Sequence, residues 1–204
     1  MNKSDYKIYY SYLAISFIFI VVTTDYLSLY DIIHVANQMD VISYNEIATN
    51  APSLPNPNSD TTIIQNVAQR FLIPYVAGSI AHFLDIDLFL IFKLLTFIFI
   101  FFYVYLINLL IKKLNFNLKV SILFFSILFL NPYLVRYHIF QPVQAHDMLF
   151  FCLGLIFSIT IINKNYFINL LATVVSIYLR QTSVALLIGS SILILINKIG
   201  RAHV

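Results

Sequence analysis

The chain of 204 residues is 60% hydrophobic and only 10% charged, with a formal net charge of +3. A soluble globular domain carries about 25% charged residues, so the composition excludes an ordinary soluble protein and favours an integral membrane protein. Cys152 is the only cysteine, which excludes a disulfide framework and a site built from several thiolates. Nothing in the sequence indicates binding to nucleic acid.

Five apolar runs are nearly free of charge and approach the length of a membrane span: Ile8–Thr24, Leu88–Ile111, Val120–Leu130, Met148–Ile162 and Tyr166–Ile196. A helix needs roughly 20 apolar residues to cross the hydrocarbon core, and backbone groups in lipid must be satisfied within the segment. A β-barrel requires alternation of apolar and polar residues, which Phe97–Phe102 lacks. We therefore expect an all-α, polytopic transmembrane helical bundle, with one transmembrane domain over residues 1–197.

The N-terminal run is predicted to be an uncleaved signal anchor, because Lys3 and Lys7 precede it and no small-x-small cleavage site follows it. No Lys or Arg occurs between Lys7 and Arg70, whereas that stretch is acidic. The positive-inside rule then predicts a multi-pass cell-membrane protein with a cytoplasmic N-terminus and a long first extracytoplasmic loop over residues 25–70. Apolar residues at helical spacing predict surface helices within Tyr26–Thr49, and prolines make residues 50–59 irregular.

Residues 71–113 allow two interpretations. If the short apolar stretch before Asp85 and the run Leu88–Ile111 both span the membrane, three lysines lie outside, against the positive-inside rule: Lys112, Lys113 and Lys119. If a surface or re-entrant helix precedes a single span, these lysines lie inside, and we favour this interpretation. Both need a break near Asp85, because one helix over the whole segment would be about twice the hydrocarbon thickness. His82 is expected to form hydrogen bonds within the bundle.

Further breaks are expected at Pro132 and near Arg180, since the last apolar run is long for one helix. The segment between Pro132 and Met148 is rich in polar side chains: Arg136, His138, Gln141, Gln144, His146 and Asp147. We expect a polar loop, or a helix start at Asp147. The two histidines are not spaced as i and i+4 metal ligands, so no metal site is indicated, and no motif predicts a cofactor.

Four residues carry the chemistry that the sequence suggests. Asp40 and Tyr44 lie one helical turn apart and can face one substrate, where a partly desolvated carboxylate acts as a general base; the alternative is a solvated acid. Arg70 suits a phosphate or serves as an interfacial anchor. Arg180 lies in an apolar run, where a charge is costly, so it should face a cavity or a partner carboxylate, unless the helix break leaves it interfacial.

Short motifs follow one another in a set order: Asp40, Tyr44, Ile47-Ala48, then Arg70-Phe71-Leu72-Ile73-Pro74, Asn131-Pro132 before Asp147, and Arg180-Gln181-Thr182. This order resembles that of the GT-C superfamily of membrane glycosyltransferases, over most of the chain. One feature departs from the pattern, because neither Asp-Glu nor Asp-x-Asp precedes Arg70. The catalytic assignment therefore depends on Asp40 alone, since Asp85-x-Asp87 comes after Arg70.

The resemblance implies transfer of a hexosyl or pentosyl group from a polyprenyl-phosphate donor to a glycan, lipid or protein acceptor at the extracytoplasmic face. Asp40 would be the catalytic base, and five residues would bind substrate: Tyr44, Glu46, Arg70, Asp147 and Arg180. Arg70 or Arg180 would stabilise the departing lipid phosphate. The competing interpretations are a transporter or channel, a flippase or polymerase of surface polysaccharides, and an assembly subunit without catalysis.

The final residues, 198–204, look foreign, because they back-translate to a sequence that resembles a common sequencing adapter. We expect the natural sequence to stop near Asn197 and the chain to be the N-terminal part of a longer protein. The alternative is an ordinary short tail.

Overall fold

The computed structural model describes residues 3–23, 39–54, 70–180, 183, 188–189 and 191–192, and within these ranges the regular elements are helices only. The expected all-helical class is confirmed. The α-helices are α1 (Lys3–Thr23), α2 (Met39–Asn50), α4 (Leu72–Leu84), α5 (Leu88–Lys113), α6 (Leu118–Phe129), α7 (Tyr137–Phe140), α8 (Ala145–Ile162) and α9 (Tyr166–Ile177). A π-helical turn, η2 (Pro132–Arg136), precedes α7, and a 3-10 turn, η3 (Pro142–Gln144), precedes α8.

Four helical segments are long and apolar enough to cross a membrane: Ser4–Val22, Leu88–Lys113, Leu118–Ile139 and Pro142–Ile162. The outer face of α1 carries large exposed apolar side chains, with Ile15 65% and Val22 71% exposed. Such a face suits contact with lipid tails and is unusual for a helix in water. Length and composition together support a membrane protein of several spans.

The break expected near Asp85 is present and has a local cause. Asp85 ends α4 with a left-handed backbone (φ 52°), a conformation that aspartate adopts more readily than most residues. Asp87 then begins α5, because its side-chain oxygen accepts a hydrogen bond from the Leu90 amide at 2.9 Å. The 13 residues of α4 extend about 20 Å, less than the roughly 30 Å hydrocarbon core. This agrees with the interpretation of one span preceded by a shorter helix.

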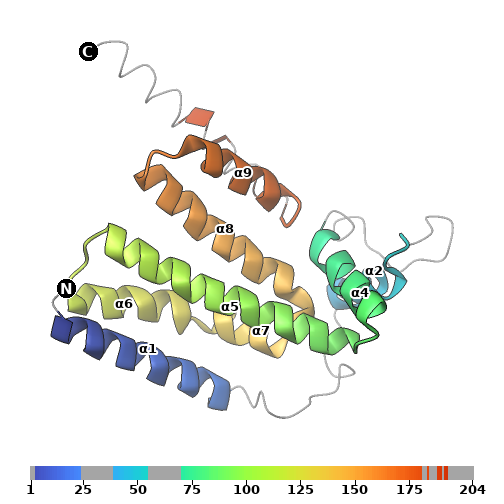
Figure 1. Ribbon diagram of the computed structural model, residues 1–204, viewed down its shortest axis with the longest axis horizontal. Helices are drawn as coiled ribbons and strands as arrows, with labels where there is room; N and C mark the ends of the chain where they lie inside the picture. The colour runs from blue at the N-terminus through green and yellow to red at the C-terminus, as the bar shows by residue number, and fades with distance from the viewer. Residues whose placement is uncertain are drawn as a thin grey trace.

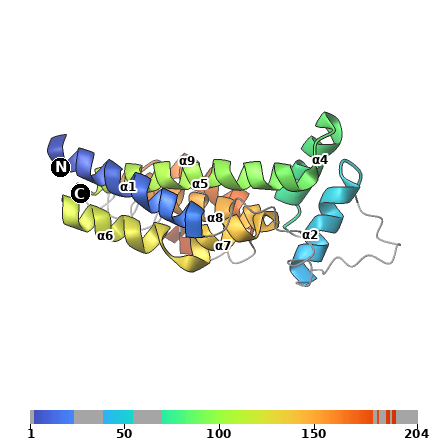
Figure 2. The ribbon, with the colours of Figure 1, turned by 90° about the horizontal axis from the view of Figure 1, so that it is seen from below.

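The long helices run antiparallel and give the molecule two chemically different ends (Figure 1). The start of α1, the α5–α6 turn and the α8–α9 turn lie together at one end, which we call the lysine end. It carries Lys7, Lys112, Lys113, Lys119 and Lys164. The opposite end, the α2 end, holds α2, α4, α7 and the first turns of α5 and α8, as Figure 2 also shows.

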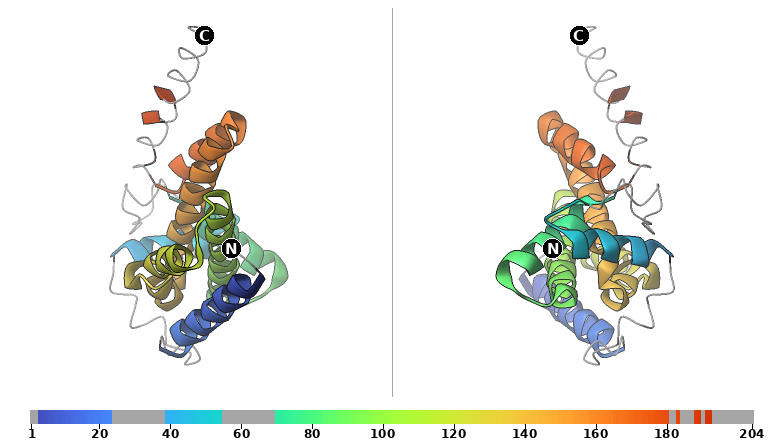
Figure 3. Two further views of the ribbon diagram at one scale, coloured as in Figure 1. Left: turned by 90° about the vertical axis from the view of Figure 1, so that its left-hand side faces the viewer. Right: turned by 90° about the vertical axis from the view of Figure 1, so that its right-hand side faces the viewer.

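The interior is formed by α1, α5, α6 and α8, with α9 packed on the outer side of α8. Figure 3 shows α1 and α9 on opposite sides of this centre. Aromatic rings join α1 to α6, since Phe129 stacks on Phe125 with ring centroids 4.8 Å apart and on Phe17 at 6.4 Å. Ile100 and Ile107 of α5 are fully buried beside them.

Several predictions about local structure can be compared with these elements. The break at Pro132 is confirmed, because α6 ends at Phe129 and a π-helical turn follows. The surface helices expected within residues 26–49 are represented by α2, whereas residues 24–38 and the tail 198–204 lie outside the described residues. The prediction for His82 is wrong: it lies on the exposed side of the last turn of α4, with its ring against Phe83.

Candidate functional site at the α2 end

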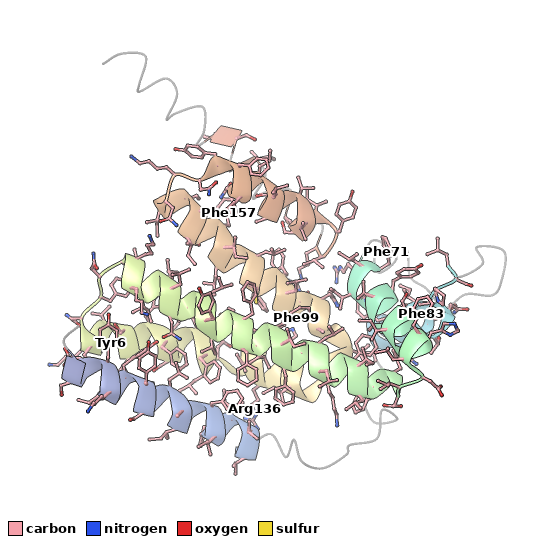
Figure 4. The ribbon with its side chains drawn as sticks, in the orientation of Figure 1. Tyr6, Phe71, Phe83, Phe99, Arg136 and Phe157 are labelled. Atoms are coloured by element: carbon pink, nitrogen blue, oxygen red, sulfur yellow. The ribbon has the colours of Figure 1, made fainter. Side chains whose placement is uncertain are left out.

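Four segments that are distant in sequence meet at the α2 end: the middle of α2, the residue pair that precedes α4, the first turn of α8 and the turn after α9. They bring Tyr44, Arg70, His146–Asp147 and Arg180 into one chain of contacts. Phe71, the neighbour of Arg70, lies at this end, far from Tyr6 at the lysine end (Figure 4). Four of the predicted substrate-binding residues therefore lie in one cluster.

Tyr44 is the centre of this cluster. It is 1% exposed, and its ring lies 4.5 Å from the His146 ring, centroid to centroid. The Arg70 Nη1 donates a hydrogen bond to the Tyr44 hydroxyl at 3.3 Å. Tyr44 thus fixes one edge of the Arg70 guanidinium and one face of the His146 imidazole at the same time.

The position of Tyr44 follows from the packing of α2 on α4. Val41, Tyr44, Ile47 and Ala48 form one buried stripe along α2, at the spacing of an amphipathic helix. The two backbones come unusually close at Gly78, where an added Cβ would lie 1.9 Å from the Ala48 carbonyl oxygen. Only glycine permits this approach. The face of α2 that carries Tyr44 therefore packs closely on α4.

Asp147 and Arg180 form a two-pronged ion pair. Arg180 Nε donates to Asp147 Oδ1 at 2.7 Å, and Arg180 Nη2 donates to Oδ2 at 3.2 Å. The Asp147 side chain is 10% exposed and that of Arg180 37%. The prediction that Arg180 faces a partner carboxylate is confirmed, as is the helix break, since α9 ends at Ile177. The pair cancels the charge of both residues.

Several polar atoms in this cluster and in the segment before α8 are buried without a hydrogen bond to any other described residue. They are Nε of Arg70, both ring nitrogens of His146, Nε2 of His138 and Oε1 of Gln141. His146 Nε2 lies 3.5 Å from Asp147 Oδ1, which is too long for a hydrogen bond. Buried polar groups are nearly always paired, and each unpaired one costs about 1–3 kcal/mol. The cluster is therefore suited to a polar ligand.

The sequence reasoning missed part of this site. The segment between Pro132 and Met148 was expected to be a polar loop or a helix start at Asp147. The predicted helix start is confirmed within two residues, because α8 begins at Ala145. The prediction of a polar loop is wrong, because four polar side chains of this segment are buried: His138, Gln141, Gln144 and His146. The sequence carries only a weak signal for this burial, since residues 138, 141, 144 and 147 each have an apolar neighbour, whereas steps of three drift around an α-helix and do not stay on one face.

Two further predicted residues, Asp40 and Glu46, lie on α2 within four positions of Tyr44. The backbone of Asp40 lies in the first turn of α2, one helical turn before Tyr44, whereas its side chain lies outside the described residues. Glu46 is half-buried and lies two positions after Tyr44, which turns it to another face of α2. The roles of Asp40 in catalysis and of Glu46 in substrate binding stay predictions.

Among the described residues, no group of three His, Cys, Asp or Glu side chains is placed to hold a metal ion. In comparisons with known proteins, no family model, no curated protein and no solved structure matches the chain. The case for a function therefore depends on the residues of the cluster and on the order of the motifs.

Proposed function

We propose that this protein is a membrane glycosyltransferase that transfers a sugar from a polyprenyl-phosphate donor to an acceptor at the extracytoplasmic face, with its site at the α2 end. The observation that supports this most is the meeting of Tyr44, Arg70, Asp147 and Arg180, which lie far apart in the sequence. These residues belong to the motifs whose order resembles the GT-C superfamily, and a shared site is what that resemblance implies for them.

Arg70 is the residue best suited to bind the donor phosphate. Arg180 is occupied by the Asp147 carboxylate, whereas Arg70 forms no ion pair with a described carboxylate. Its Nη1 is held by Tyr44, and its Nε is buried without a partner among the described residues. An arginine with a free edge can donate two parallel hydrogen bonds to a phosphate.

The proposed reaction needs one base and one stabiliser of negative charge. Asp40 takes the proton from the acceptor hydroxyl, and the acceptor oxygen forms a bond to the anomeric carbon of the sugar. The bond between that carbon and the phosphate oxygen breaks, and its electron pair leaves with the lipid phosphate. Arg70 stabilises the charge that develops on this leaving group, in surroundings where water is largely excluded. Asp147 and Arg180 hold the first turn of α8, and with it His146, in position.

The distribution of lysines supports the orientation that this function requires. Five lysines lie at the lysine end, opposite the α2 end (Figure 1). The α2 end holds Arg70, Arg136 and Arg180, of which Arg180 is paired with Asp147. An excess of lysine and arginine marks the cytoplasmic end of a membrane protein. The N-terminus and the α5–α6 turn would then face the cytoplasm. The cluster around Tyr44 would face outward, where a lipid-linked sugar can meet an acceptor, in a multi-pass protein of the cell membrane.

The base can be tested in membranes that contain the whole protein, supplied with radiolabelled polyprenyl-phosphate sugars. We expect Asp40→Asn to abolish transfer while leaving membrane insertion unchanged. Asp85→Asn is a matched control, because it removes an exposed carboxylate at the same end and asparagine tolerates the left-handed backbone. Transfer that persists in Asp40→Asn but is lost in Asp85→Asn would move the base to the Asp85-x-Asp87 sequence. Accumulation of label inside vesicles without transfer would favour a transporter.

A further inference from the structure

A pocket at the lysine end has no part in the proposed transfer reaction. It lies between the first half of α1 and the C-terminal end of α5, is partly open to solvent, and leaves a cavity of about 40 Å³ for water-sized groups. Its walls include Tyr6, Tyr9, Tyr10, Asn108, Lys112 and Phe116.

Tyr9 provides a hydrogen-bonding group that the protein leaves unused. The residue is 2% exposed, and its hydroxyl has no hydrogen-bond partner within the described part of the chain. The ring is held edge-on against Phe125, with centroids 6.1 Å apart, and against Tyr10 at 5.7 Å. Because a buried hydroxyl without a partner is costly, a ligand that offers this hydroxyl an acceptor gains affinity.

The charge around the pocket favours a negatively charged ligand. Lys112 lines the pocket, and Lys7, Lys113 and Lys119 lie at the same end. Asp5 is the one acidic residue that the described part of the chain contributes to this end. Asn108 uses its amide nitrogen to bind the Val104 carbonyl at 2.8 Å, which leaves its amide oxygen as an acceptor for a ligand.

The surroundings of the pocket point to a lipid. Ile8 and Tyr10 of α1 are 51% and 46% exposed, and Leu114 after α5 is 40% exposed. Tyr10 lines the pocket, whereas Ile8 and Leu114 belong to the exposed apolar surface of α1 and of the α5–α6 turn, which acyl chains can cover. Tyrosine at the level of the headgroups is typical of membrane proteins.

We propose that this pocket binds the headgroup of an anionic phospholipid. The phosphate lies between the Lys112 ammonium and the Tyr9 hydroxyl, and Asn108 accepts a hydrogen bond from a hydroxyl of the headgroup. Basic residues close to a membrane surface attract anionic lipids in general, but the pocket adds a donor and an acceptor at fixed positions. The pocket therefore distinguishes headgroups by the positions of their hydrogen-bonding groups as well as by their charge.

The test uses the whole protein in nanodiscs of phosphatidylcholine alone or with phosphatidylglycerol, and native mass spectrometry to count the lipids that stay bound. We expect the protein to retain phosphatidylglycerol in preference to phosphatidylcholine. Tyr9→Phe should reduce this retention roughly tenfold, as loss of a hydrogen bond to a charged group does, and Lys112→Gln roughly fivefold. Lys164→Gln is the matched control: it removes a lysine at the same end, outside the pocket, and should leave retention unchanged.

Thermal unfolding separates a loss of binding from a folding defect. Tyr9→Phe removes a buried hydroxyl without a partner, so in phosphatidylcholine the variant should unfold at the same temperature as the wild type or a higher one. Addition of phosphatidylglycerol should raise its unfolding temperature by less than it raises that of the wild type. Equal losses of retention in Lys112→Gln and Lys164→Gln would show general electrostatic attraction and overturn the proposal. Equal stabilisation by inorganic phosphate in phosphatidylcholine nanodiscs would also overturn it, because the ligand would then be a free anion.

Discussion

Arg180 and Asp147 are joined by two hydrogen bonds, at 2.7 and 3.2 Å, although 33 residues separate them in the sequence. The contact ties the turn that follows α9 to the first turn of α8. It also places the guanidinium 5.7 Å from the ring centre of Phe150, one turn along α8. Arg180 lies in an apolar run, where an isolated charge is costly, and Asp147 provides the opposite charge.

Removal of one member of this pair should destabilise the protein. Arg180→Gln leaves the Asp147 carboxylate buried with weaker partners, and we expect the free energy of unfolding to fall by about 1–3 kcal/mol. This is less than the loss for a fully buried pair, because Arg180 is 37% exposed. Unfolding of the purified protein in detergent, followed by circular dichroism, measures the change.

A double-mutant cycle isolates the pair itself. If the two residues act together, Arg180→Gln combined with Asp147→Asn should cost less than the sum of the two single substitutions. Strictly additive losses would mean that the contact contributes nothing to stability.

The close approach of α2 and α4 at Gly78 gives a second prediction. The Cβ introduced by Gly78→Ala would lie 1.9 Å from the Ala48 carbonyl oxygen, so the helices must separate, at a cost of about 1–3 kcal/mol. Because Tyr44 lies on the same face of α2, this substitution should also reduce sugar transfer.

Gly154→Ala is the control for Gly78→Ala. Nothing lies within 4 Å of the Cβ position at Gly154, in the middle of α8. Alanine there should leave stability unchanged or raise it by up to about 1 kcal/mol through helix propensity. If both substitutions had the same effect on thermal unfolding, the α2–α4 contact at Gly78 would not be tight.

Asn169 should hold α9 against α8. It is buried, and its amide nitrogen donates to the Thr160 hydroxyl at 3.1 Å and to the Phe157 carbonyl at 3.3 Å. Hydrogen bonds between membrane helices contribute on average about 0.6 kcal/mol and at most about 1.7, so Asn169→Ala should destabilise within this range. Ser158→Ala is the control, because its hydroxyl binds the Gly154 carbonyl of its own helix, and it should change SDS-induced unfolding very little.

The orientation in the membrane can be measured by cysteine labelling. The native Cys152 is buried and should not react. We expect Ile86→Cys, in the exposed break between α4 and α5, to react with a membrane-impermeable maleimide in intact cells. Lys164→Cys, in the α8–α9 turn, should react only after the cells are permeabilised. The reverse pattern would place the α2 end in the cytoplasm and contradict the proposed function.

Much of the helical framework could be predicted because its causes are local. Long apolar runs predicted the helices. The breaks near Asp85 and Arg180 followed from runs too long for one helix, and the break at Pro132 followed from the proline itself. The choice between one and two spans around Asp85 was harder, because an apolar helix of 13 residues looks the same in sequence whether it crosses a membrane or lies along it.

The site could be predicted only in part, because it depends on contacts between distant segments. The sequence suggested Tyr44, Arg70, Asp147 and Arg180 as separate candidates. It predicted that Arg180 faces a cavity or a partner carboxylate, without showing that the partner is Asp147. His146 was considered only as a metal ligand, since its contact with Tyr44 requires α2 to pack beside α8. His82 was misjudged because α4 is apolar around it, although its outer side is exposed.

The most direct test of the account is the initial rate of sugar transfer by the whole protein in membranes, with a radiolabelled polyprenyl-phosphate sugar as donor. We expect transfer above that of membranes without the protein. We also expect Arg70→Gln to lower the rate by roughly 100-fold or more, as loss of a group that stabilises transition-state charge does, while Lys164→Gln keeps the wild-type rate. A wild-type protein without transfer to any acceptor present in its own membranes, or a fully active Arg70→Gln variant, would contradict it.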